Sequence, residues 1–279
     1  MSAMVISTNI SSLAAQRHLA SSRADMEQAM ERLSSGKRIN SAMDDAAGLT
    51  IAHSLDGKIA GLNQAVRNAN DGIAMVNLAE GAMEEISTML TRMKELAVQG
   101  SNGTLTSNDL PNIGKEYDAL REEITRISDT TTFNGKQVIG TAAPGTVKFQ
   151  LGDTSTDSIT LDLADMSSTA LSLDVYADAT KVTNAYDTPT SALAEIDAAI
   201  GAVDTYRASL GAVANRMEHA ATNLMSRVEH QSAARSRIED ADYAVESANL
   251  AKAQVLQQAG TAMLAQANAS TSNVVSLLR

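Results

Sequence analysis

Apolar residues recur at alternating spacings of four and three over more than forty residues in the N-terminal half of the chain. The series is interrupted once, at Glu80, and consists of Leu55, Ile59, Leu62, Val66, Ala69, Ile73, Val76, Met83, Ile86, Leu90, Met93 and Ala97. Such spacings place the side chains on one stripe of an α-helix, as in a coiled coil. At about 1.5 Å per residue, the stretch from Leu55 to Val98 predicts a helix roughly 65 Å long. A compact globule rarely holds a rod of this length.

A second stripe of the same kind lies in the C-terminal half. It follows one strict seven-residue grid through Leu193, Ile196, Ile200, Val203, Leu210, Ala214, Met217, Ala221, Leu224, Val228 and Ile238. Polar Arg207, Gln231 and Arg235 occupy the remaining grid positions. Ser191, with Glu195 just inside the first turn, is the predicted N-cap of this helix. A chain that leaves and returns along one antiparallel bundle has this pattern.

Shorter helical segments are predicted at both ends and at 114–128. The first runs from about Asn9 to Leu33, where Leu19, Met26 and Leu33 recur every seven residues, and Gly36 follows as a C-terminal cap. The last begins near Ala241, with a seam of small residues at Val245, Ala248, Ala251, Val255, Ala259 and Ala262. Such seams bury little area, so the terminal helices need partners, and copies of the same chain are the simplest ones.

Between the helices the apolar period changes to two. Val147, Phe149 and Leu151 alternate with polar residues, as do Ile159, Leu161 and Leu163, and a polar turn separates the two runs. This alternation predicts a β-hairpin within a region of about 130–190 that is rich in Thr, Ser, Asp and Gly. The Ser and Thr residues fit either O-glycosylation or a plain exposed loop. The predicted fold class is therefore mainly α, a long antiparallel helical rod with a small central hairpin.

Composition and net charge argue against several classes of function. Net charge is −11 and there is no cysteine, which argues against nucleic acid as a partner and excludes disulfides, zinc–thiolate sites and cysteine catalysis. The N-terminus lacks a signal-peptide pattern, and no apolar run reaches the roughly 18 residues of a membrane span. By these signals alone the chain is expected to be cytoplasmic, with no membrane partner.

No constellation of residues indicates an enzyme, a metal site or a cofactor. The four histidines lack metal-ligand spacing, and phosphate-binding glycine loops and nucleophile elbows are absent. Asp44 and Asp45 are consecutive, so on a helix they do not face each other, and a capping role is the expected one.

Several short segments stand out as motifs, and they include Leu33-Ser-Ser-Gly-Lys-Arg-Ile-Asn40 with the following Asp44-Asp-Ala-Ala-Gly48, then Asn68-Ala-Asn-Asp-Gly-Ile73, Thr132-Phe-Asn-Gly135, Ala234-Arg-Ser-Arg-Ile-Glu-Asp-Ala-Asp-Tyr243 and Ala253-Gln-Val-Leu-Gln-Gln-Ala-Gly260. In these segments the sequence resembles bacterial flagellin. The matches cover about residues 1–140 and 190–279 in the family's order. A hook–filament junction protein has similar ends, but the dense matches inside both halves favour flagellin.

The resemblance implies a division of labour. Residues 1–40 and 241–279 are expected to be terminal helices that pack in the inner tube of a filament, and residues 41–240 an outer helical rod. Flagellins leave the cell unfolded by the flagellar type III route, so the resemblance implies a secreted, extracellular product despite the missing signal peptide. Implied partners are other copies of the chain, an export chaperone, and the filament cap and junction proteins.

The resemblance also implies contact residues. Arg92, Leu96 and Glu116 match positions recognised by the flagellin-sensing Toll-like receptor of animal hosts, although Thr91 departs from the Gln of well-recognised relatives; filament packing is the expected main role. The expected assembly residues are Leu19, Met26, Leu33, Val245, Val255, Leu264, Val275, Leu277 and Leu278. Val275, Leu277 and Leu278 also suit an export chaperone or a cytosolic innate sensor. A soluble immune ligand or signalling coiled coil remains the rival of another class, and a stable folded monomer would mark it.

Overall fold

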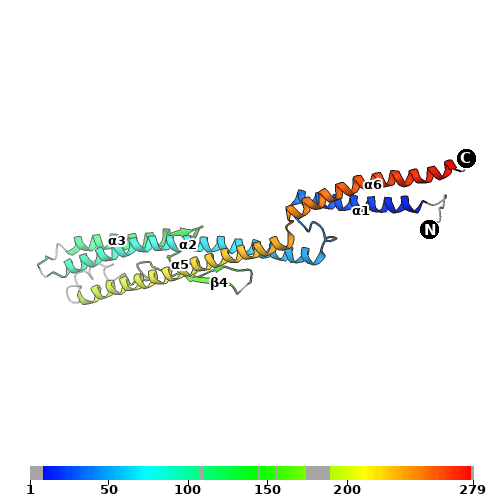
Figure 1. Cartoon of the computed structure of the whole chain (residues 1–279). Helices are drawn as coiled ribbons and strands as arrows, with labels where there is room; N and C mark the ends of the chain where they lie inside the picture. The colour runs from blue at the N-terminus through cyan, green and yellow to red at the C-terminus, as the bar shows by residue number, and fades with distance from the viewer. Residues whose placement is uncertain are drawn as a thin grey trace. The chain divides into compact units, whose positions relative to one another are not determined.

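The computed structural model describes residues 9–102, 104–106, 110–143, 145–154, 156–173 and 189–277, with side chains left out at 189–192 and 270–277. The chain divides into two compact units (Figure 1). Unit 1 comprises residues 1–59 and 229–279, and unit 2 comprises residues 60–228. The helices are α1 (Ile10–Ser35), α2 (Ala46–Gly100), α3 (Leu110–Thr130), α5 (Pro189–Glu239) and α6 (Tyr243–Leu277). The mainly α fold predicted from the sequence is confirmed.

The helix boundaries differ from the predicted ones at several starts, among them α3, which begins at Leu110 and not at Gly114. Helix α2 begins at Ala46, nine residues before the first seam residue Leu55, because Asp45 accepts a hydrogen bond from the Gly48 amide at 2.9 Å and caps the first turn. The capping role expected for Asp45 is thereby confirmed. Helix α5 begins at Pro189, so the prediction of Ser191 as its N-cap is wrong. Proline suits the first helical position, where its missing N–H would have no partner in any case.

In unit 1, α1 and α6 lie side by side and antiparallel (Figure 1). Asn9 caps α1 by accepting from the Ser12 amide at 3.0 Å, and its side-chain amide donates to the Ala267 carbonyl at 3.0 Å. At the other end of the pair, Arg32 bridges to Glu246 at 3.1 Å. Gly36 ends α1 in the left-handed conformation, with φ of 72°, as its position in the sequence predicted.

The seam predicted for α6 does not face α1 within the subunit. Its residues Val245 and Val255 are 54% and 64% exposed. The less exposed residues of α6 follow a seven-residue series, and they are Glu246, Leu250, Ala253, Gln257, Gly260, Leu264 and Ala267. Gly260 belongs there because a Cβ at this position would lie 3.2 Å from the Leu19 side chain. Apolar periodicity alone does not indicate this series because it contains Glu and Gln, whereas the predicted seam is entirely apolar.

The core of unit 2 is built from α2, α3 and α5, as predicted. Many of its most deeply buried side chains come from the two long seams, and they include Met83, Ile86, Leu90, Met93, Ile196 and Leu210. Others are Ile124 from α3 and Ile139, Leu161 and Leu173 from the segment between α3 and α5. The polar interruptions of the two seams pair with each other, since Arg207 bonds to Glu80 at 2.7 Å. A charged pair within an apolar seam specifies the register of two helices.

Four strands form two hairpins in unit 2. The predicted hairpin is confirmed as β3 (Thr146–Gln150) and β4 (Ser158–Asp162), antiparallel with Phe149 opposite Ile159. Sequence analysis missed a second hairpin, β1 (Thr132–Phe133) with β2 (Lys136–Gln137), whose strands have two residues each. Its signal was the Asn134-Gly135 pair, which favours the tight turn between two strands.

Helix α2 holds the β3–β4 hairpin through Asn68 and Gly72, both in the segment that resembles flagellin. The Asn68 side chain donates to the Gln150 carbonyl at 2.9 Å. At Gly72 a Cβ would lie 2.6 Å from the sulfur of Met217 and 3.2 Å from the Phe149 ring, so glycine lets α5 and the hairpin both approach α2.

We therefore expect Gly72→Ala to lower the free energy of unfolding by about 1–3 kcal/mol, because the fully buried Met217 has no free space to move into. Gly81→Ala on the same helix is the matched control, since a Cβ there meets no atom within 4 Å. Alanine at that position should stabilise by about 0.5–1 kcal/mol through helix propensity. Urea unfolding measures both variants, and equal effects would contradict the close approach at Gly72.

Candidate assembly site

The contact between α1 and α6 buries very few side chains. Among the described residues of these helices, only Ser12, Ala29, Glu246 and Ala253 are buried. Two of the four are polar, so the pair gains little from the removal of apolar area from water. Two helices with so thin an interface have little stability of their own.

The same helices expose large apolar side chains on their remaining surface. In α1 these are Ile10, Leu13 and Met30, and in α6 they are Val245, Val255, Leu256 and Met263. Met263 is 64% exposed. A concentration of large exposed apolar side chains on two helices indicates an interaction surface. Leu13, Leu256 and Met263 were not among the residues singled out from the sequence, although Leu256 adjoins Val255 in the chain.

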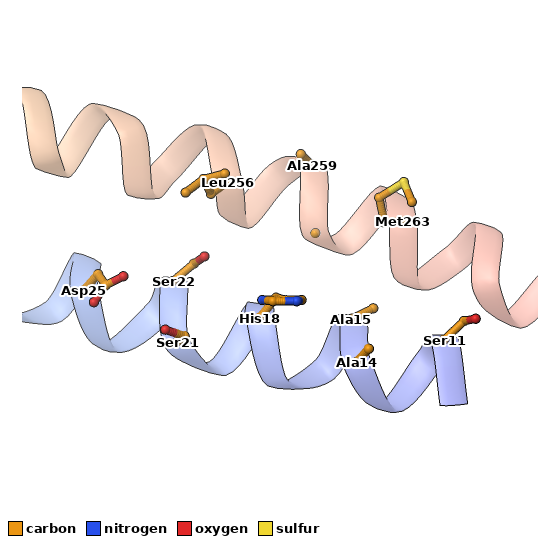
Figure 2. Close-up of a pocket in the computed structure, with 11 residues that line it drawn as sticks. Ser11, Ala14, Ala15, His18, Ser21, Ser22, Asp25, Leu256, Ala259 and Met263 are labelled. Atoms are coloured by element: carbon orange, nitrogen blue, oxygen red, sulfur yellow. The ribbon is translucent and has the colours of Figure 1, made fainter. Parts of the chain in front are cut away.

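An open groove of about 650 Å³ runs between α1 and α6 (Figure 2). Small residues of α1, among them Ala14, Ala15 and Ser22, form one wall, and Leu256 and Met263 of α6 project from the other. The small side chains of α1 leave room for side chains from another helix. The groove is therefore shaped for helix packing and not for a small ligand held by convergent polar groups.

The expected assembly residues are distributed over both kinds of surface. Leu19, Met26, Leu33 and Leu264 are half-buried in unit 1, whereas Val245 and Val255 are exposed. Val275 and Leu277 belong to α6, but their side chains lie outside the described residues, as does the whole of Leu278.

The loop between α1 and α2 is fastened to the junction between α5 and α6. The Arg38 amide donates to the Glu239 carbonyl at 2.6 Å, and the Ala241 amide donates to the Gly36 carbonyl at 2.9 Å. Lys37 forms an ion pair with the buried carboxylate of Glu239. Two chain segments about two hundred residues apart are thus joined by main-chain bonds and a charged pair.

Asp44 organises the same loop. Its carboxylate accepts hydrogen bonds from the Ser41 amide at 2.9 Å and from the Ser41 hydroxyl at 3.0 Å, and a further one from Gln28 of α1 at 3.1 Å. These bonds, led by the one from the Ser41 backbone, lower the pKa of Asp44 below its ordinary value of 3.8. The ionised side chain therefore ties the loop to α1.

The residues expected to meet a host receptor lie on α2 and α3 of unit 2. Arg92 bonds to Glu116 at 2.9 Å and to Glu95 at 2.8 Å, and all three side chains are exposed. These bonds raise the pKa of the Arg92 guanidinium, the contact with Glu95 first. Leu96 is only 2% exposed and belongs to the core. The structure thus brings Arg92 and Glu116 together on the surface, whereas Leu96 is buried in the core.

Within the described part of the chain, no group of three or more His, Asp or Glu side chains is arranged to hold a metal ion. The described helices include none that is both long enough and apolar enough to cross a membrane.

Comparison with known proteins identifies the family. Residues 6–142 match the bacterial flagellin N-terminal helical region, and residues 193–278 match the flagellin C-terminal helical region. The chain belongs to the bacterial flagellin family. A flagellin from Halalkalibacterium halodurans is 43% identical over 99% of this chain and 100% of that protein, and one from Bacillus subtilis is 41% identical with the same coverage.

A structural neighbour shares the fold at low identity. The crystal structure of Bacillus cereus FlgL superposes with a TM-score of 0.52 and 16% identity, and covers 67% of this chain and 98% of that one. At this identity the likeness concerns the fold alone. The much higher identity to flagellins over the full length agrees with the preference for flagellin drawn from the motifs.

We expect Asp44→Asn to lower the stability of the protein in a pH-dependent way. Because the folded-state pKa of Asp44 lies below its unfolded value, its contribution is fully present above pH 3.8 and is lost as the pH falls through the folded pKa. The difference in urea midpoint between wild type and Asp44→Asn should be constant near neutrality and should shrink below about pH 4. A difference that grew on acidification would contradict this assignment.

Proposed function

We propose that the chain is the structural subunit of a bacterial flagellar filament, assembled from copies of itself through α1 and α6. Membership of the flagellin family supports a filament subunit outside the cell. The observation that carries the assembly role is the exposed apolar surface of two helices that bury almost nothing against each other. Packing against other copies supplies the missing burial.

The distribution of charge also supports α1 and α6 as the surface through which copies associate. Residues of unit 1 include ten Lys and Arg against eleven Asp and Glu, a net charge of −1, whereas unit 2 has twelve against twenty-two, a net charge of −10. Nearly neutral helices approach copies of themselves with little repulsion, while the acidic unit 2 resists close contact between like surfaces. Residues 1–40 and 241–279 are therefore the proposed inner-tube segments, and 41–240 the proposed outer rod.

The thin α1–α6 interface also supports folding on assembly. Ordering a residue costs about 1–2 kcal/mol, which an interface of four buried side chains does not offset. The subunit is proposed to leave the cell unfolded by the flagellar route with an export chaperone, and to fold at the tip beneath the cap, above the junction proteins. Contacts between unlike surfaces that do not close produce an open helical polymer.

Seeded polymerisation tests the proposal. Val255→Asp, or deletion of 241–279, should abolish elongation, because a carboxylate on the apolar face of α6 must be desolvated when copies pack. Val98→Asp in unit 2 is the control, since Val98 is 56% exposed but lies outside both terminal segments. Negative-stain microscopy and far-ultraviolet circular dichroism should show filaments and a gain of helix for the wild type and the control.

Either of two results would overturn the proposal. Filaments formed by the deletion variant would show that α6 is not needed for assembly. A folded wild-type monomer that never elongates would favour a junction protein or a soluble ligand instead.

Recognition by a host flagellin-sensing Toll-like receptor is a second proposed role, supported by the exposed Arg92–Glu116 pair. Arg92→Ala should weaken receptor activation, because it removes a cation presented beside a carboxylate. Arg126→Ala is the control, since Arg126 forms a similar exposed pair with Glu123 on α3. Equal activation by wild type and Arg92→Ala would refute the role of Arg92. The buried Leu96 is proposed to support this surface from below.

A further inference from the structure

The turn between β1 and β2 leaves one backbone amide unusually accessible. Asn134 and Gly135 form the whole loop, and both have positive φ, 50° and 77°. This is the geometry of a two-residue hairpin turn, in which asparagine and glycine are preferred. Both residues are exposed, and a Cβ added at Gly135 would meet no atom within 4 Å. The Gly135 amide donates no hydrogen bond to any described residue.

We propose that Asn134 is a site of spontaneous covalent modification, in which its side-chain amide is converted to a carboxylate. The Gly135 nitrogen attacks Cγ of Asn134 and forms a five-membered succinimide, while the Cγ–Nδ2 bond breaks and ammonia leaves with the amide proton. Water then opens the ring at either carbonyl and gives aspartate or isoaspartate. Water is the only co-reactant, and no oxidant or reductant is consumed.

The structure distinguishes this asparagine from Asn40 and Asn223. At Asn40 the next amide, that of Ser41, is engaged by Asp44 at 2.9 Å, and Asn40 itself is half-buried. Asn223 is exposed, but it lies inside α5 and precedes Leu224, which is buried and whose amide belongs to the helical ladder. At Asn134 neither a hydrogen bond nor a neighbouring side chain holds back the attacking nitrogen.

The two products have different consequences for the fold. Aspartate keeps the turn, because Asp-Gly also suits this geometry. Isoaspartate inserts an extra carbon into the main chain, and the pairing of Phe133 with Lys136 has no room for it. The chain then enters the core at once, since Val138 and Ile139 are fully buried and Ser128 donates to the Ile139 carbonyl at 2.7 Å. Isoaspartate should therefore loosen the segment that follows α3.

The test is to age the intact protein in mildly alkaline buffer made with heavy-oxygen water and to map its tryptic peptides. Peptides 127–136, 39–58 and 217–227 each contain one asparagine, at 134, 40 and 223. Conversion with uptake of heavy oxygen should be at least about tenfold faster at Asn134 than at the other two, a barrier difference of about 1.4 kcal/mol. Equal rates at the three sites, or an unchanged Asn134, would overturn the proposal.

A second measurement tests the consequence separately. The Asn134→Asp variant should melt within error of the wild type, while the aged isoaspartate fraction, isolated by ion exchange, should melt at a lower temperature. Asn134→Gln should block conversion, because its ring closure is larger and slower. An isoaspartate fraction that melts like the wild type would refute the predicted loosening.

Discussion

The thin interface between α1 and α6 makes these two helices depend on further contacts for their stability. Helices α1 and α6 meet through small, polar and half-buried apolar side chains, and four fully buried residues are too few to offset the ordering of two helices. Larger residues on the inner faces would have made a stable pair, but Gly260 against Leu19 shows that the helices are built to lie close with little between them. Several large apolar side chains of both helices are exposed instead. A subunit built this way is completed only by its neighbours, which is the property a polymer-forming chain requires.

Unit 2 differs from this pair of helices, because its own buried core stabilises it. Its two long seams supply fully buried Leu, Ile and Met side chains, and each polar interruption is compensated, as Glu80 is by Arg207. The β3–β4 hairpin is fixed to α2 by the Asn68 hydrogen bond and by the close approach at Gly72. The excess of ten negative charges lies on this self-sufficient unit, where it discourages unwanted association without weakening the contacts of unit 1.

Sequence patterns predicted most of unit 2 because its seams are long, apolar and strictly periodic. The same method identified α6, but the apolar seam it favoured is exposed in the subunit, and the residues that face α1 form another series that contains Glu and Gln. The buried series could be recognised only from the partner: Glu246 is inside because Arg32 neutralises it, and Gly260 because Leu19 needs the space. The β1–β2 hairpin was missed for another reason, because strands of two residues are too short to show a period. Only the residues of the turn indicate such a hairpin in the sequence. The groove between α1 and α6 was also beyond sequence reasoning, because it is defined by what small side chains on two distant segments leave empty.

Helix α2 contributes side chains both to the core of unit 2 and to its surface. Leu96 and Met93 are buried in the core while Arg92 and Glu95 are exposed, although Arg92 and Leu96 lie only about one turn apart. The resemblance assigns Arg92 and Leu96 the same expected role, but burial separates them, since only Arg92 is accessible to a partner. Burial likewise separates Val255 and Leu264, nine residues apart in α6 and both expected to serve assembly: Leu264 is half-buried within the subunit, and Val255 is exposed.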